Sequence, residues 1–148
     1  MTVPQPPPLP TSETLILLAS QVGGHPGVLS SDDGEFVVKP TFHSEIKFYE
    51  KLRSEAAFSA LIPFIPRFHN TIDLQAGTYT LPATPSHRRA IVIENLCHRF
   101  SRPNVVDIKL GTVLYDDNAS VERRARRESV ARATTTFETG IRIIGFQV

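Results

Sequence analysis

The pattern of hydrophobic and polar positions along the 148-residue chain changes several times, and each pattern predicts a type of element. Two apolar segments near residues 28–30 and 35–39 flank an Asp-Gly pair, which predicts a β-hairpin. Residues 43–58 carry apolar side chains at helical spacing, with Ser44 placed to cap the helix. The expected buried stripe of this helix consists of Ile46, Tyr49, Leu52 and Ala56.

Further along, prolines and new apolar runs divide the rest of the chain. Residues 61–72 contain two prolines and predict a connection that leads into a short strand. Residues 89–96, RAIVIENL, are expected to form a core strand. A helix is predicted from about Ser120 and a strand over 140–148, which together indicate an α+β fold.

The segment PNVVDIKLGT, residues 103–112, has a different alternation. An extended strand places on one face Asp107, Lys109 and Gly111. The opposite face, which we expect to be core, holds Val106, Ile108 and Leu110. The polar face is either an outer surface with an ion pair or a ligand site, and the strand alone does not decide between them.

Composition narrows the class of protein. The chain is 41% hydrophobic and 21% charged with a net charge of +1, which is typical of a globular domain and argues against a strongly basic nucleic-acid-binding protein. No apolar run approaches the eighteen or so residues that a membrane span needs, so we expect no membrane association. The single Cys97 and the lack of a signal-like leader favour an intracellular location.

Lys39 and Glu45 form the first candidate pair. Lys39 ends an apolar strand and Glu45 opens the next helix, an arrangement that kinases use to hold ATP phosphates. An exposed lysine, and a glutamate favoured by the helix dipole, explain the same residues. Because the sequence lacks GxGxxG, GxxxxGK[ST] and an HRD-type loop, we exclude a P-loop enzyme and an ordinary protein kinase.

Residues 122–132, ERRARRESVAR, hold five arginines and two glutamates. On a helix that begins near Ser120, Arg126 and Arg127 each lie within about 60° of Arg123. Clustered guanidinium groups suit multiply phosphorylated ligands, because each can form charge-assisted hydrogen bonds with phosphate. A solvated charged face and a nucleic-acid-binding helix are the alternatives.

These segments converge on one family. PNVVDIKLG fits the PxxxDxKxG signature of the inositol polyphosphate kinases, with matching residues Pro103, Asp107, Lys109 and Gly111. The segments FVVKP, SEIKFYEKL and IVIENLCHRFSRP, and the sequence after Leu114, resemble inositol polyphosphate multikinases of fungal type. The resemblance extends from about Gln21 to Val148.

The resemblance implies a nucleotide site. Lys39 would bind ATP phosphates, and Glu45 would be the helix acid near it. Glu94 and Leu96 would belong to a hinge whose backbone and acid read adenine, and Asp107 would hold the ribose hydroxyls. ATP and Mg²⁺ are the implied cofactors.

The resemblance also implies a substrate site. Lys109 would approach both the transferred phosphate and the inositol phosphate, so Asp107 and Lys109 are the candidate catalytic residues. The arginine helix would bind the inositol polyphosphate through Arg123, Arg126 and Arg127. Relatives in this family continue to an SLL segment and an IDF segment, whose aspartate binds Mg²⁺; neither segment occurs in these 148 residues. We expect that metal ligand beyond Val148, and therefore little activity from this chain alone.

The implied architecture is a small kinase-like antiparallel-sheet lobe with one helix, a hinge and the start of a larger α+β lobe. We expect a proline-rich disordered arm over 1–14, the ATP-binding lobe over 15–90, the hinge over 91–102 and the second lobe over 103–148. A noncatalytic inositol phosphate-binding or scaffold fragment, which would bind protein partners, is the alternative function. Family members work in the nucleus and cytoplasm, which is the expected location.

Overall fold

The computed structural model describes residues 8–11, 14–19, 21–23, 27–74 and 89–148. The chain divides into two compact units. The first unit comprises Met1–Gln21 and His25–Ser101, and the second unit comprises Val22–Gly24 and Arg102–Val148. No helix in the described part of the chain is long and apolar enough to cross a membrane.

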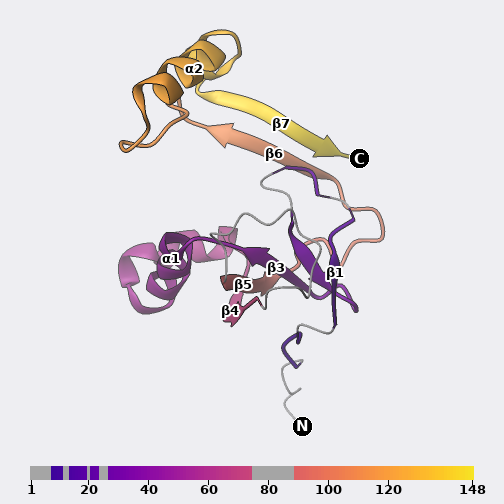
Figure 1. The fold of residues 1–148 in the computed structure, drawn as a ribbon. Helices are drawn as coiled ribbons and strands as arrows, with labels where there is room; N and C mark the ends of the chain where they lie inside the picture. Colours follow the sequence, from indigo (N-terminus) through magenta and orange to yellow (C-terminus); the bar gives the residue numbers. More distant parts are fainter. Residues whose placement is uncertain (1–7, 12–13, 20, 24–26, 75–88) are drawn as a thin grey trace. The chain divides into compact units, whose positions relative to one another are not determined.

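An antiparallel five-stranded sheet with the order β1-β2-β3-β5-β4 forms the centre of the first unit (Figure 1). Its strands are β1 (Leu15–Leu17), β2 (Leu29–Ser31), β3 (Phe36–Pro40), β4 (Phe68–Asp73) and β5 (Arg89–Glu94). Four of the five were predicted from the apolar pattern. The sequence analysis missed β1, because three residues are too few to establish an alternation. The predicted arm over 1–14 lies largely outside the described residues.

The β2–β3 hairpin is confirmed, displaced by one residue from the prediction. Gly34 has a φ of 77°, which a residue with a Cβ rarely adopts, so the Asp-Gly pair matches this turn. The Asp33 carboxylate accepts hydrogen bonds from the Ser31 hydroxyl at 2.6 Å and the Glu35 amide at 3.0 Å. These two bonds, the Ser31 bond above all, hold the pKa of Asp33 below its ordinary value.

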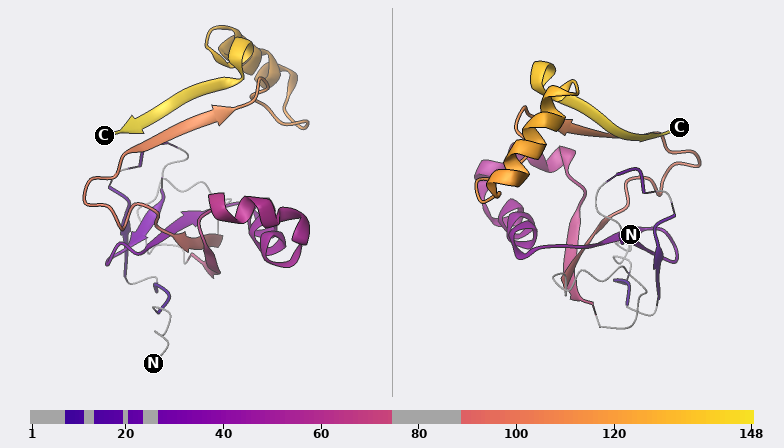
Figure 2. Two further views of the ribbon diagram at one scale, coloured as in Figure 1. Left: turned by 180° about the vertical axis from the view of Figure 1, so that it is seen from behind. Right: turned by 45° about the horizontal axis from the view of Figure 1, so that its top comes forward.

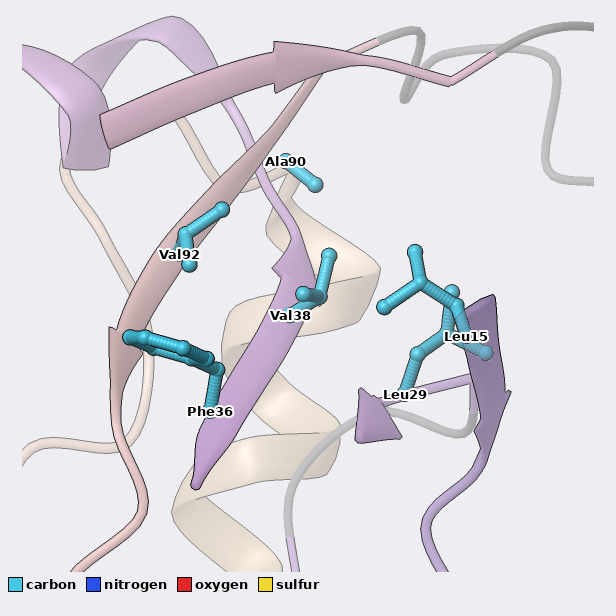
Figure 3. Close-up of a cluster of buried hydrophobic side chains, with 6 residues drawn as sticks. All are labelled: Leu15, Leu29, Phe36, Val38, Ala90 and Val92. Carbon is cyan, nitrogen blue, oxygen red and sulfur yellow. The ribbon is translucent and has the colours of Figure 1, made fainter. Parts of the chain in front are cut away.

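Both faces of the sheet are covered. Alternation along β5 turns Ala90 and Val92 to one face and Ile91 to the other. The first face holds a cluster drawn from β1, β2, β3 and β5 (Figure 3): Leu15, Leu29, Phe36, Val38, Ala90 and Val92. On the second face, Ile91 packs with the buried stripe of α1 (His43–Ser54): Ile46, Tyr49 and Leu52.

Two details of the predicted helix were wrong. Ser44 lies inside α1, since Phe42 is the N-cap residue and no side chain caps the helix. Ala56 does not extend the buried stripe, because Glu55 adopts an extended conformation that ends α1. A 3₁₀-helix, η2 (Ala56–Phe64), follows, and none of its residues is buried.

The second unit contains a two-stranded antiparallel sheet of β6 (Val105–Leu110) and β7 (Ile141–Gln147). Between the strands the chain forms α2 (Val121–Arg132) and the short α3 (Thr136–Thr139), at the end where β6 stops and β7 starts (Figures 1 and 2). The predicted N-terminus of α2 is confirmed, because the Ser120 hydroxyl accepts a hydrogen bond from the Arg123 amide.

The prediction that one face of β6 is core was wrong. Val106 is 53% exposed, and Ile108 and Leu110 are also exposed. Among the described residues of the second unit, only Ala131 and Thr136 are buried. The alternation correctly sets which side chains share a face, but no described element of this unit buries the apolar one.

Candidate functional site

Lys39 and Glu45 form an ion pair in the first unit. Lys39 lies near the end of β3, and Glu45 lies in the first turn of α1. Lys39 Nζ is 2.7 Å from Glu45 Oε1, and the two side chains are 40% and 31% exposed. An exposed ion pair contributes little to stability, so its arrangement matters more for presenting an oriented ammonium group to an anion.

Thr41 completes this arrangement, and the sequence analysis did not identify it. Its side chain is buried, at 4% exposure, and its hydroxyl donates a hydrogen bond to Glu45 Oε2. Each carboxylate oxygen of Glu45 therefore has its own partner, with Lys39 on Oε1. The signal available in the sequence was a threonine four residues before the glutamate, which alone is too common to be informative.

The predicted hinge follows β5. The Glu94 side chain is turned toward Arg67 and Arg99, with Oε2 3.4 Å from the Arg67 amide and Oε1 3.9 Å from Arg99 Nη2. Leu96 is exposed. The Glu94 carboxylate is thus engaged by one backbone amide and one guanidinium group, which leaves backbone groups of the hinge as the more available partners for a planar ligand.

Asn95 ties the hinge to the β2–β3 hairpin, and it was missed in the sequence. Its side-chain amide donates to the Gly34 carbonyl at 2.8 Å, and its backbone amide donates to the Glu35 carbonyl at 2.9 Å. Its side-chain oxygen accepts from the Cys97 amide at 3.0 Å. Both segments are thereby held in one fixed arrangement within the first unit.

Asp107 lies in the second unit at an irregular point of the sheet. It pairs with Gly145, and the register shifts between Asp107 and Ile108. A Cβ atom on Gly23 would lie 2.0 Å from Asp107 Oδ2, and one on Gly145 would lie 2.0 Å from the Val22 carbonyl oxygen. Residues 22 and 23 therefore lie directly against the strand pair here, and the backbone contact at Gly145 leaves no room for a larger residue.

A pocket of about 420 Å³ opens beside the ends of β6 and α2. We call it the cationic pocket, and its lining residues are Lys109, Leu110, Val113, Leu114, Tyr115, Asp116, Arg123, Arg127 and Arg142. Four of these side chains are basic and one is acidic. The concentration of positive charge makes a polyanion the best-matched ligand.

Two further observations support an anion in this pocket. Lys109 faces Arg142 directly across the β6–β7 ladder, and like charges opposite each other destabilise a sheet. The Nε atoms of Arg127 and Arg142 are buried without a hydrogen-bond partner among the described residues. Buried guanidinium nitrogens are costly when unpaired, and a phosphate bound in the pocket would offset the repulsion between Lys109 and Arg142.

The arginines of α2 divide into different roles. Arg123 and Arg127 line the cationic pocket, whereas Arg126, which was predicted to join them, does not. Arg142 joins the pocket from β7 and was missed, because it comes from a strand about fifteen residues along the chain. Arg124 is structural, since it donates to the carbonyls of Ala119 and Asp117.

Tyr115 connects the pocket wall to α2. Its hydroxyl donates to Glu128 Oε1 at 2.9 Å, and the Arg124 guanidinium lies 5.6 Å from its ring centroid. The hydrogen bond to Glu128 raises the pKa of Tyr115 above its ordinary value. Tyr115 therefore stays protonated at neutral pH and adds no negative charge to the pocket.

The described residues offer no centre for a metal. No group of three histidine, cysteine, aspartate or glutamate side chains in the described part of the chain is placed to bind an ion. The basic groups of both units suit phosphate oxygens rather than a cation.

Comparison with known proteins identifies relatives of the chain. The family model for inositol polyphosphate kinase matches residues 90–148, which include β6, α2 and β7. Inositol polyphosphate multikinase from Saccharomyces cerevisiae is 29% identical over 89% of this chain and 46% of its own length. The multikinase from Schizosaccharomyces pombe is 33% identical over 88% of this chain and 50% of its own length.

The fold is similar to a solved structure. The crystal structure of inositol phosphate multikinase Ipk2 from S. cerevisiae in complex with ADP and Mn²⁺ matches with a TM-score of 0.59 and 34% identity, over 76% of this chain and 38% of that one. This likeness confirms the predicted kinase-like α+β fold. The chain spans about half the length of the curated multikinases named above, and its residues 90–148 match the inositol polyphosphate kinase family.

Proposed function

We propose that the chain contributes nucleotide- and substrate-binding parts of an ATP-dependent inositol polyphosphate kinase. The observation that carries this proposal is the cationic pocket, where Arg127 and Arg142 have buried nitrogens without partners beside the signature residue Lys109. The multikinase relatives, and the ADP in the related crystal structure, support a nucleotide-dependent reaction.

In the first unit, Lys39 would bind ATP phosphates while Glu45 and Thr41 hold its ammonium group in place. The backbone around Glu94 and Leu96 would read adenine. A charge-assisted hydrogen bond to a phosphate contributes about 1.5–3 kcal/mol, which makes the orientation of Lys39 worth maintaining. These roles come from the family resemblance and are compatible with the observed ion pair.

In the second unit, Asp107 would accept hydrogen bonds from ribose hydroxyls, and Lys109 would neutralise charge on the transferred phosphoryl group. Arg123, Arg127 and Arg142 would hold phosphates of the inositol ring, with Arg126 outside the pocket. Phosphoryl transfer depends mainly on positioning and on neutralising charge, and these basic side chains supply both. A bound divalent metal would add charge neutralisation at the nucleotide phosphates.

Isothermal titration calorimetry with the 148-residue chain tests the two binding roles separately. We expect binding of ADP and of inositol 1,4,5-trisphosphate, with Arg127→Ala weakening the second and leaving the first unchanged. Arg126→Ala is the matched control, since it removes the same charge from the same helix outside the pocket. Failure of the wild-type chain to bind trisphosphate, or equal losses in both variants, would contradict the proposal.

A noncatalytic inositol phosphate-binding or scaffold role is the second candidate. It is supported by the cationic pocket, whose basic side chains can bind an inositol phosphate whether or not a phosphoryl group is transferred. The test is incubation of the purified chain with Mg-ATP and inositol 1,4,5-trisphosphate. We expect little or no turnover, while clear formation of a tetrakisphosphate would eliminate the noncatalytic role.

A further inference from the structure

Asp116 is the one acidic side chain that lines the cationic pocket. It follows Tyr115 in the loop before α2, among residues that otherwise favour phosphate. An acid in the wall of a phosphate site is unexpected if the ligand is only an anion, because it repels the charge that the arginines attract. Its presence favours a ligand that also carries a hydrogen-bond donor, because a carboxylate accepts hydrogen bonds.

The Asp116 carboxylate is held by the backbone rather than by the pocket cations. Its Oδ1 atom accepts a hydrogen bond from the Asn118 amide at 3.0 Å. Among the described residues it forms no ion pair with Lys109 or with any of the lining arginines. This hydrogen bond within the turn limits the movement of the carboxylate.

A ring that carries both hydroxyls and phosphates can bind a pocket lined by arginines and one carboxylate. A ring hydroxyl donates a hydrogen bond to a carboxylate, whereas a phosphate in the same place carries about −1.5 to −2 charge at neutral pH and is repelled by it. A ring with phosphates at some positions and hydroxyls at others can turn a hydroxyl toward Asp116 and phosphates toward the arginines. A ring phosphorylated at every position has no orientation that avoids the repulsion.

We propose that Asp116 makes the cationic pocket select inositol phosphates that retain a free hydroxyl and discriminate against the fully phosphorylated ring. This inference rests on the proposed function of the pocket. Asp116 would determine specificity by repelling a phosphate at its own position. The arginines attract every phosphate, so they alone cannot provide this discrimination.

The test compares inositol 1,4,5-trisphosphate with inositol hexakisphosphate by isothermal titration calorimetry, at one fixed ionic strength, for the 148-residue chain and Asp116→Asn. Asparagine keeps the Oδ1 acceptor for Asn118 and removes only the charge. We expect the hexakisphosphate affinity to rise about tenfold, as removal of one close like charge predicts, while the trisphosphate affinity stays level or falls.

Asp117→Asn is the matched control, because it removes the same charge one residue away from a side chain that does not line the pocket. We expect it to change both affinities by the same small factor. Equal ligand preference in the two variants would overturn the role of Asp116. Should Asp116→Asn fold poorly by circular dichroism, Asp116→Ser supplies an uncharged acceptor of shorter reach for the same comparison.

The outcome also separates this inference from the function on which it rests. If the wild-type chain binds neither inositol phosphate, the proposed function fails and the selection by Asp116 fails with it. If both ligands bind, Arg127→Ala weakens both, and Asp116→Asn leaves their ratio unchanged, the phosphate pocket stands and the selective role of Asp116 is wrong.

Discussion

The two units of the molecule use their apolar side chains differently. In the first unit, both faces of the sheet are packed, and residues such as Leu29, Val38 and Ile91 are fully buried. In the second unit, the β6–β7 sheet leaves most of its large apolar side chains exposed, and the described residues bury only Ala131 and Thr136. A two-stranded sheet with little burial is marginally stable in water.

The difference indicates where stability and binding reside. The first unit contains the two hydrophobic clusters, so most of the folding free energy is expected there. The second unit contains the cationic pocket, where Lys109 and Arg142 oppose each other at a cost to the sheet. Mutations in the two units should therefore affect different measurements.

The largest expected effect is on stability in the first unit. Ile91→Ala removes a side chain with 0% exposure and should lower the free energy of unfolding by about 2–5 kcal/mol, because a cavity replaces buried contacts. Ile143→Ala, at a position 61% exposed on β7, should change it by less than about 0.5 kcal/mol. Urea denaturation followed by circular dichroism measures both, and similar losses would contradict the contrast between units.

The next effect is on ligand binding in the second unit. Arg142→Ala should weaken the binding of inositol 1,4,5-trisphosphate by about 1.5–3 kcal/mol, since it removes a charge-assisted partner from the pocket. The same change should not lower stability, because it also removes the cation opposite Lys109. Calorimetric titration measures the change in binding, and thermal unfolding of the same sample measures the change in stability. A large loss of stability would contradict the prediction that Arg142 contributes to binding rather than to folding.

A smaller effect is expected on nucleotide binding in the first unit. Thr41→Val keeps the shape of the buried side chain but removes the hydrogen bond that holds Glu45. ADP affinity should fall by about 0.5–1.5 kcal/mol, the usual contribution of one hydrogen bond. Thr41→Ser restores the hydroxyl and should restore the affinity. A Thr41→Ser variant as weak as Thr41→Val would mean that packing, not the hydrogen bond, is responsible.

The smallest effect is a pH dependence that belongs to the first unit. Burial, together with the charge of Arg67, holds the pKa of His69 below its ordinary value of 6.5. Well above pH 6.5 the histidine is neutral in both the folded and the unfolded state. As the pH falls below 6.5, the unfolded chain takes up the proton first, so stability decreases.

Thermal unfolding at pH 7.5 and pH 5.5 measures this difference, and His69→Gln should reduce it by removing the titrating group. The residues that line the cationic pocket include no histidine, so they should not contribute to this difference in thermal stability. A variant whose midpoint shifts with pH as much as that of the wild type would assign the dependence to other groups.

Much of the fold could be predicted because its signals are local. The hairpin at Gly34, the capped start of α2 at Ser120, and strands β5 to β7 follow from turn residues and apolar alternation. The exposure of Val106 could not be predicted, because alternation shows which side chains share a face but not whether another element covers it.

In the candidate site, too, contacts between residues distant in sequence could not be predicted from local patterns. Lys39 and Glu45 are close in sequence, and a lysine that faces a helix glutamate was one of two interpretations of the pattern, the one that the observed ion pair matches. Arg142 joins the cationic pocket through the pairing of β6 with β7, a relation that no spacing within one helix contains. Asn95 likewise gains its role from a hairpin about sixty residues earlier.

The contact of residues 22 and 23 with the β6–β7 sheet also affects how the molecule can be divided. A fragment cut at residue 102 would contain the signature strand and the arginine helix, but it would lack the backbone that lies against Asp107 and Gly145. The second unit is therefore discontinuous in sequence, and no single cut excises it whole. A minimal binding module would need residues 22 and 23 joined to the fragment by a designed linker, with glycine kept at position 145, where a Cβ atom would meet the Val22 carbonyl oxygen.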